Sequence, residues 1–272
     1  MEEKKLALLI DGDNISSKYI KTIIDESTAY GVVTYKRIYG DWTKPNLDSW
    51  KKELLEYSIN PMQQYAYTSG KNATDSAMII DAMDILYTKT VDGFILVSSD
   101  SDFTRLAARL KESGMIVIGM GKTQTPKPFV SACNQFKFLD VLSEENDEID
   151  KQEDAKKTTK LKIHSKTSQT QKEDIVEQSS KTPLKDILQS ISKIIAENSD
   201  EEGWVSASII GIDLTKKHSD FDVRNYNCKK LSEFLEKNGY EINKIQDPNN
   251  IKNPTGYLIY VRENDVKKES RK

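Results

Sequence analysis

The chain has 272 residues and a formal net charge of −3, from 40 lysines and arginines against 43 aspartates and glutamates. Its hydrophobic content of 37% and charged content of 31% indicate a soluble protein with one sizeable core or two smaller domains. No apolar run has the length of a membrane span or the form of a secretory signal, so we expect a cytoplasmic protein without a membrane partner. Because the net charge is slightly negative, any nucleic-acid binding must come from local basic clusters.

Strand and helix patterns alternate along the first half of the chain. We expect strands at 5–11, 32–39, 62–67, 93–98, 115–120 and 136–140, helices at 16–29, 47–57, 74–88 and 102–113, and a short helix after Pro126 and Pro128. This alternation predicts an α/β domain over residues 1–142, with a parallel sheet covered by helices on both faces. A GxGxxG or Walker signature is absent, which excludes dinucleotide-binding and P-loop functions.

Acidic side chains follow two of the predicted strands. Asp11, Asp13 and Asn14 end the segment LLIDGDN, and Asp100 and Asp102 end the segment FILVSSDSDF. The carboxyl ends of parallel strands share one edge of a sheet, so we expect these groups to meet in one crevice. Crowded carboxylates repel one another unless a cation compensates, and oxygen ligands suit Mg²⁺ or Mn²⁺. Capping of the next helix is the purely structural alternative for each acid.

The predicted helix at 74–88 brings further acids towards this crevice. Asp75 lies in its first turn, while Asp81 and Asp84 lie further along, where a solvated helix face is the alternative. Asp81, like Asp13, is a secondary candidate for the metal site. Lys71 precedes Asp75 by four residues in a glycine-containing loop, from which it is expected to reach a phosphate.

Histidine and cysteine chemistry is not supported. Cys133 and Cys228 are far apart, and His164 and His218 cannot build a histidine metal site or a serine triad alone. If the chain is an enzyme, carboxylates carry its chemistry, with no organic cofactor.

The second half predicts a linker and a small domain. Residues 143–182 are charged and polar without aromatic side chains, which is typical of a disordered linker. Residues 183–263 show three helical patterns and two strands, the outline of a winged helix, before a charged tail at 264–272. Basic residues around the third helix are predicted to contact RNA phosphates. They are Lys216, Lys217, Arg224, Lys229 and Lys230. A winged helix that docks a protein partner is the alternative.

Two ordered sets of motifs carry a family resemblance. The segments LLIDGDNIS, RIYGDW, GKNATDSAMIIDAMDIL, VDGFILVSSDSDFTRLAARLKESGMIVIGMG and TPKPFVSACNQFKFLD together resemble the NYN domain, a PIN-like nuclease fold, in its LabA-like bacterial branch. The segments ILQSISKII, GWVSASIIG and FDVRNYNCKKLSEFLEKNGYEI resemble the LOTUS domain, also called OST-HTH, an RNA-associated winged helix. The resemblance implies a metal-dependent ribonuclease that acts on single-stranded or structured RNA. It assigns catalytic and metal-binding roles to Asp11, Asp75, Asp100 and Asp102. Asn14, in the same motif as Asp11, is expected to contact RNA beside them.

Two positions qualify this expectation. Asn134 stands where the family's usual Ala-Cys-Asp pattern has an aspartate, and metal affinity falls if that position belongs to the acidic cluster. Asp41 in RIYGDW is either a further carboxylate of the site or a turn-stabilising residue.

Two other functions stay open from the sequence. One is a non-catalytic RNA-binding or scaffold protein. The other is a haloacid-dehalogenase-like phosphatase with Asp11 as nucleophile, although Ile15 stands where that class has Thr or Val. The sequence also leaves a homodimer open.

Overall fold

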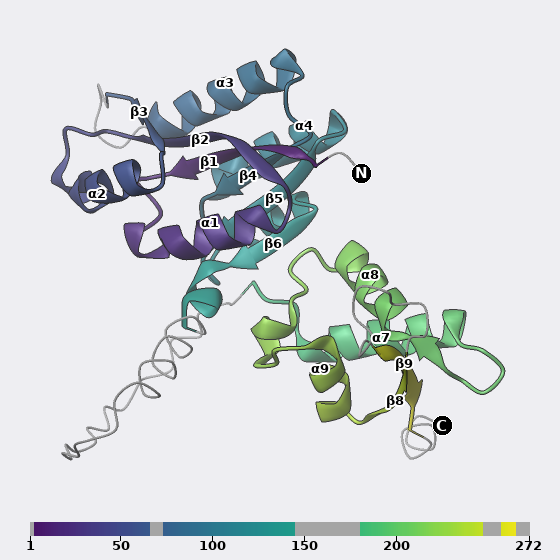
Figure 1. The fold of residues 1–272 in the computed structure, drawn as a ribbon. Coiled ribbons are helices and arrows are strands. Elements are labelled where there is room, and N and C mark those ends of the chain that lie inside the picture. Colours follow the sequence, from purple (N-terminus) through teal and green to yellow (C-terminus); the bar gives the residue numbers. More distant parts are fainter. Residues whose placement is uncertain (1–2, 66–72, 145–179, 247–256, 265–272) are drawn as a thin grey trace, which may run out of the picture.

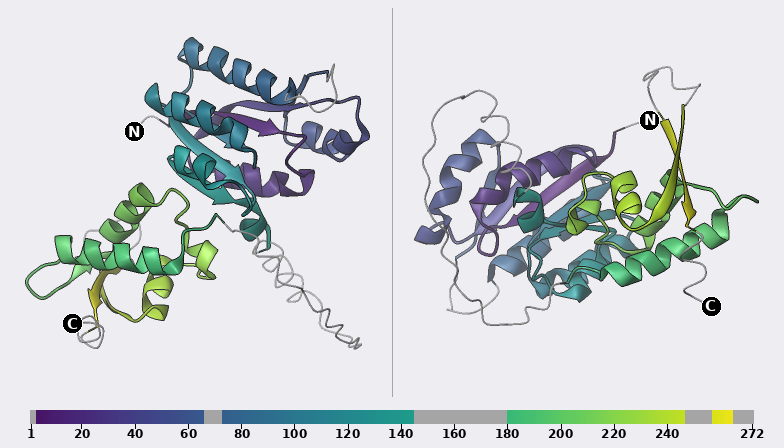
Figure 2. Two further views of the ribbon diagram at one scale, coloured as in Figure 1. Left: turned by 180° about the vertical axis from the view of Figure 1, so that it is seen from behind. Right: turned by 90° about the horizontal axis from the view of Figure 1, so that it is seen from below.

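The computed structural model describes residues 3–65, 73–144, 180–246 and 257–264. A larger α/β domain precedes residue 145, and a smaller domain begins at residue 180 and packs beside it (Figures 1 and 2). Most of the predicted linker, residues 145–179, lies outside the described residues, as does almost all of the predicted tail. Within the described ranges, no helix combines the length and apolar character that crossing a membrane requires.

The larger domain is built on a six-stranded sheet in which every neighbouring pair is parallel. Its strands are β1 (Lys5–Asp11), β2 (Val32–Gly40), β3 (Asn60–Gln63), β4 (Gly93–Val97), β5 (Ile116–Gly121) and β6 (Gln135–Phe138). They lie in the order β3-β2-β1-β4-β5-β6, so the sheet grows in one direction from β1 and in the other from β4. The neighbours β1 and β4 therefore form the topological switch point, where doubly wound sheets open a crevice for ligands.

Helices cover both faces of this sheet because the buried strands are apolar on both sides (Figure 1). Leu6, Leu8 and Ile10 of β1 pack into the core shared with the first two helices, whereas Ala7 and Leu9 pack into the core on the other face. The helices of the domain are α1 (Ile20–Thr28), α2 (Asp48–Glu56), α3 (Ala73–Thr88), α4 (Thr104–Glu112) and α5 (Lys127–Ala132). Short 3₁₀ helices, η1 (Ser17–Tyr19), η2 (Pro45–Leu47) and η3 (Ser101–Phe103), precede α1, α2 and α4. The predicted α/β class with helices on both faces is confirmed.

Two predicted strands are displaced. The strand expected at 62–67 begins at Asn60 instead and ends at Gln63, because β3 pairs with β2 alone and an edge position tolerates Pro61. The strand expected at 136–140 ends at Phe138, and residues 139–144 are helical.

The smaller domain confirms the winged-helix outline. Its helices are α7 (Leu184–Asn198), α8 (Ala207–Lys217) and α9 (Leu231–Lys237), with a 3₁₀ helix η4 (Val223–Tyr226). Its strands β7 (Val205–Ser206), β8 (Tyr240–Gln246) and β9 (Tyr257–Glu263) form an antiparallel sheet in the order β7-β9-β8. Ile187 and Ile191 of α7 and Phe234 of α9 are buried in its core. The loop expected between the two long strands, residues 247–256, lies outside the described residues.

Hydrogen bonds join the smaller domain to β6, to α5 and to the loop after β5. The amide of Phe136 donates to the carbonyl oxygen of Ser219 at 2.7 Å, and the Ser219 hydroxyl donates to the carbonyl of Val130 at 2.9 Å. The amide of Ser180 donates to the carbonyl of Thr123 at 3.0 Å. The two domains are therefore docked directly against each other at β6 and the segments beside it.

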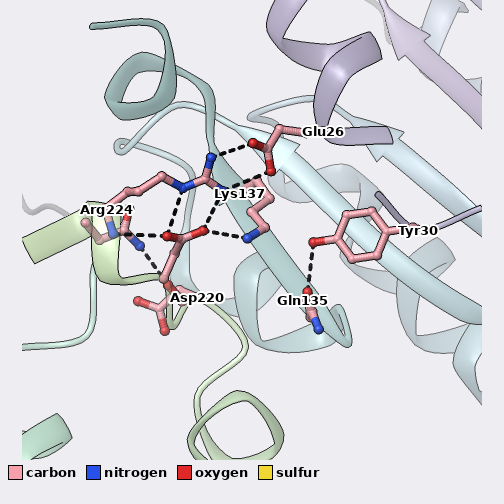
Figure 3. Close-up of polar contacts among 8 residues, drawn as sticks. Glu26, Tyr30, Gln135, Lys137, Asp220 and Arg224 are labelled. Atoms are coloured by element: carbon pink, nitrogen blue, oxygen red, sulfur yellow. Dashed lines mark hydrogen bonds and ion pairs between the residues drawn. The ribbon is translucent and has the colours of Figure 1, made fainter. Parts of the chain in front are cut away.

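A four-residue ionic network reinforces the docking (Figure 3). The guanidinium of Arg224 donates two hydrogen bonds to Glu26 of the larger domain, at 2.5 and 3.0 Å, and two to Asp222 beside it, at 3.0 and 2.7 Å. Lys137 of β6 completes the network by donating to Asp222 at 2.5 Å. Burial alone would raise the pKa of the Asp222 carboxyl, but its bonds to Arg224 and Lys137 hold that pKa well below the usual range.

Candidate metal centre

Two acids lie at the carboxyl ends of the strands that form the switch point. Asp11 is the last residue of β1, and Asp100 follows the neighbouring β4 by three residues. Asp100 caps η3 by accepting a hydrogen bond from the amide of Asp102 at 2.9 Å, so the capping interpretation applies to one of its oxygens. The same turn brings the Asp102 side chain to this edge of the sheet.

Asp75 joins these acids from the first turn of α3. One carboxylate oxygen each from Asp75, Asp100 and Asp102 lie within 4.8 Å of one another, with the first two side chains half-buried and the third exposed. Burial raises the pKa of Asp75, and repulsion by Asp100, Asp102 and Asp13 raises it further. An all-oxygen set that repels itself in this way fits a hard divalent cation such as Mg²⁺ or Mn²⁺.

Asp11 is the most buried acid of the site, with 3% of its surface exposed. Its carboxylate accepts hydrogen bonds from the backbone amide of Asn14 at 3.2 Å and from the Ser98 hydroxyl at 2.8 Å. Burial raises its pKa to about 6, with further repulsion from Asp75 and Asp13, while the two hydrogen bonds oppose the rise. Asp11 therefore holds its proton more tightly than an ordinary aspartate, and a nearby cation would favour its ionised form.

Polar side chains fasten the loops that carry the acids. Asp13 accepts from the Thr74 hydroxyl at 2.9 Å and from the Asn46 amide group at 3.3 Å, which joins the loop after β1 to the start of α3. Asn14 accepts from the amide of Ser99 at 2.9 Å, which joins that loop to the end of β4. The metal-binding role of Asp13 and the RNA contact of Asn14 remain predictions.

Ser98 is a residue of the site that sequence reasoning missed. Its hydroxyl donates to Asp11 and accepts from the amide of Asp100 at 3.0 Å, so it couples the acids of the two strands. The available signal was a small polar residue placed between a buried strand and an acidic pair.

Asp81 lies apart from the acidic triad. Its carboxylate forms an ion pair with Arg37 and accepts a hydrogen bond from the Tyr39 hydroxyl, both from β2. Asp81 is thus paired with β2 and is not one of the three clustered acids, and its role as a secondary metal ligand stays a prediction.

Asp41 stabilises a turn. One oxygen accepts from the Thr43 hydroxyl at 2.6 Å and from Gln63 at 3.1 Å, which confirms the turn-stabilising alternative.

Asn134 lies at the other end of the sheet. Its side-chain oxygen accepts from the amide of Val117 at 2.9 Å, beside the amino ends of β5 and β6. The acids stand at the carboxyl ends, so an amide at this position does not remove a ligand from the cluster. The condition for a loss of metal affinity, that position 134 belongs to the acidic cluster, is therefore not met.

The predicted phosphate contacts fall into three groups. Lys71 lies outside the described residues. The guanidinium of Arg224 is held by Asp222 and Glu26 in the domain junction, so its expected role as an RNA contact is corrected. The remaining four lysines are exposed. They are Lys216 and Lys217 at the end of α8, and Lys229 and Lys230 just before α9.

Comparison with known proteins agrees with this division of the chain. The NYN domain family matches residues 5–140, and the OST-HTH/LOTUS domain family matches residues 178–251. An uncharacterized protein of Methanocaldococcus jannaschii is 27% identical over 124 residues, which are 44% of this chain and 48% of that protein. The matched region thus spans about half the length of this relative.

A solved structure also resembles the chain. The crystal structure of a protein of unknown function from Vibrio parahaemolyticus has 20% sequence identity and a TM-score of 0.43, and the match covers 51% of this chain and 96% of that one. The doubly wound sheet, the acidic triad at its switch point and the two family matches lead to one assignment: the chain belongs to the NYN family of PIN-like proteins and carries a C-terminal OST-HTH/LOTUS domain.

Proposed function

We propose that this protein is a metal-dependent ribonuclease that hydrolyses RNA phosphodiester bonds at the acidic cluster. The convergence of Asp75, Asp100 and Asp102 within 4.8 Å at the switch point is the observation that carries the proposal. The NYN domain belongs to the PIN-like nucleases, which usually use divalent metals, and both domain families imply an interaction with RNA.

Each acid has a distinct part in this proposal. Asp75, Asp100 and Asp102 would hold Mg²⁺ or Mn²⁺ through their carboxylate oxygens, and the buried Asp11 would add negative charge next to Asp75. When bound, such an ion supplies a water of lowered pKa and stabilises negative charge on the phosphate. Ser98 keeps Asp11 and the Asp100 loop in register through its two hydrogen bonds.

The test compares wild-type protein with an Asp11→Asn, Asp100→Asn double variant on end-labelled single-stranded and structured RNAs. Asp84→Asn is the matched control, because Asp84 is exposed on the same helix as Asp75 but about 14 Å further along its axis. We expect cleavage with Mn²⁺ or Mg²⁺, none with EDTA, none in the double variant, and full activity in the control.

Cleavage that persists in the double variant would refute the assignment of the acids. RNA binding without cleavage by the wild-type protein under every metal condition would instead favour the non-catalytic alternative. The phosphatase alternative loses its basis, because the chain belongs to the NYN family.

A further inference from the structure

A cavity of about 770 Å³ lies at the junction of the two domains, away from the acidic cluster. Lys4, Ile116 and Gln135 line it at the amino ends of β1, β5 and β6, and Thr215 and Ser219 line it from the smaller domain. The acids stand at the carboxyl ends of the same sheet. Because β1 has seven residues, about 20 Å separates its two ends.

The wall of this interdomain cavity is strongly basic, although the whole chain is slightly acidic. Its charged lining residues are Lys4, Lys111, Lys127, Lys216 and Lys217 against Asp186 and Asp220. Asp220 accepts hydrogen bonds from the amide and hydroxyl of Thr182, each at 2.6 Å, and Lys216 forms an ion pair with Asp213 at 3.1 Å. The lysines of the lining still outnumber its aspartates when Lys216 is set against Asp213, and this excess favours an anionic ligand.

Lysines from both domains face the same space. Burial lowers the pKa of His218, which also lines the cavity, and Lys217 and Lys127 lower it further, against opposing effects of Asp220 and Asp186. Lys127 belongs to α5 of the larger domain and Lys217 to α8 of the smaller one. The docked arrangement therefore brings lysines of the two domains together around one cavity.

The neutral part of the wall includes polar groups that suit a phosphate backbone. Tyr30, an aromatic residue of the lining, uses its hydroxyl to donate to Gln135 at 2.8 Å (Figure 3). Ser131, Thr215 and Asn134 add small polar groups beside the lysines. Ammonium and hydroxyl groups of this kind bind phosphate oxygens without reading sequence.

We propose that the interdomain cavity binds the phosphate backbone of an RNA strand between lysines of the two domains. The inference rests on the proposed function for the identity of the ligand as RNA, but it concerns a separate surface. A strand that reaches both this cavity and the acidic cluster spans at least about six stacked nucleotides, at about 3.4 Å for each. Long RNAs would thus be held at one end of the sheet and cut at the other.

Asn134 offers a sharp test because aspartate has the same shape. Asn134→Asp keeps an oxygen for the Val117 amide and places a negative charge in the cavity wall. The matched control is Asn60→Asp, which makes the same charge change at an exposed position on β3, the opposite edge strand. A Lys127→Gln, Lys217→Gln double variant removes one charge from each domain.

Binding is measured on the full chain in EDTA, by fluorescence anisotropy of a labelled 20-nucleotide single-stranded RNA over a series of salt concentrations. We expect Asn134→Asp to weaken binding about fivefold and Asn60→Asp to leave it unchanged. The double lysine variant should weaken binding about tenfold and reduce the slope of log K against log salt by about 1.4, since each phosphate contact contributes about 0.7.

Three results would overturn the proposal. The first is that the wild-type chain does not bind RNA. The second is that the Asn134→Asp and Asn60→Asp variants bind RNA with equal affinity. The third is that equimolar inorganic phosphate or ATP displaces the RNA, which would indicate a small phosphate ligand. Because the assay contains no divalent metal, it stays separate from cleavage. A protein that does not cleave RNA, but whose RNA binding weakens in Asn134→Asp, would refute the nuclease proposal and support this site. A protein that cleaves RNA, but whose RNA binding does not respond to Asn134→Asp, would support the nuclease proposal and refute this site.

Discussion

The ionic network around Arg224 should determine how tightly the two domains stay docked. Replacing Arg224 with methionine keeps an apolar stem of similar shape but removes the two hydrogen bonds to Glu26 and the two to Asp222. Truncating one partner of a buried charge pair costs about 2 to 5 kcal/mol. The side chains of Arg224 and Glu26 are 27% and 17% exposed, which places the cost near the lower end, at about 2 kcal/mol.

The amide of Phe136 reports this docking directly, because it donates across the junction to Ser219. A loss of about 2 kcal/mol should speed its hydrogen exchange about 30-fold in native-state NMR measurements. Glu26→Gln, which leaves the pair with Asp222 in place, should have a smaller effect of about fivefold. The amide of Gly12 bonds to Tyr39 within the larger domain at 2.9 Å and is the internal control. Unchanged exchange at Phe136 in the Arg224→Met variant would show that the network does not hold the domains together.

Three further outcomes follow from the structure. Because the folded-state pKa of Asp11 is raised to about 6, the folded protein loses stability as pH rises from the ordinary carboxyl pKa to 6. Asp11→Asn should therefore stabilise the metal-free protein by up to about 3 kcal/mol at pH 7.5 and hardly at all at pH 4. Urea unfolding in EDTA at the two pH values measures this difference. Equal gains at both pH values would contradict the burial argument. A methyl group at Gly119 would stand 2.3 Å from the ring of Phe136. Gly119→Ala should therefore lower the free energy of unfolding by about 1 to 3 kcal/mol in the same assay. A neutral effect would show that the ring moves freely. Asp81→Asn should lower thermal stability, because it weakens the pair with Arg37. The metal concentration for half-maximal cleavage should stay unchanged, and a large rise in it would show that Asp81 is a metal ligand.

The sequence predicted the parts of the site that depend on local order along the chain. A buried strand followed by acids specifies which side chains emerge at a strand's carboxyl end, and Asp11 and Asp100 are found there. Asp75 was equally accessible to this reasoning, because an acid in the first turn of a helix is a local feature. The order of the strands then brought these acids together.

The errors concern contacts between distant segments. Nothing near Arg224 in the sequence indicates that Glu26, 198 residues earlier, is its partner, so an exposed phosphate contact was the natural expectation. The sequence left open whether Asn134 belongs to the acidic cluster, because a short motif does not reveal which end of a strand it adjoins. Similarly, the strand expected at 62–67 begins at Asn60, because its pairing with β2 and its edge position, which tolerates Pro61, depend on contacts between distant segments.

The bond between Phe136 and Ser219 has a consequence for solubility. A sheet edge with free amide and carbonyl groups invites pairing with the strand of another molecule, which leads to aggregation. At one edge, β3 has four residues and contains Pro61, which lacks an amide hydrogen. At the other edge, β6 is covered by the winged helix. A truncated NYN domain expressed alone would leave the Phe136 amide without this partner, and we expect it to pair with strands of other molecules more readily than the full chain does.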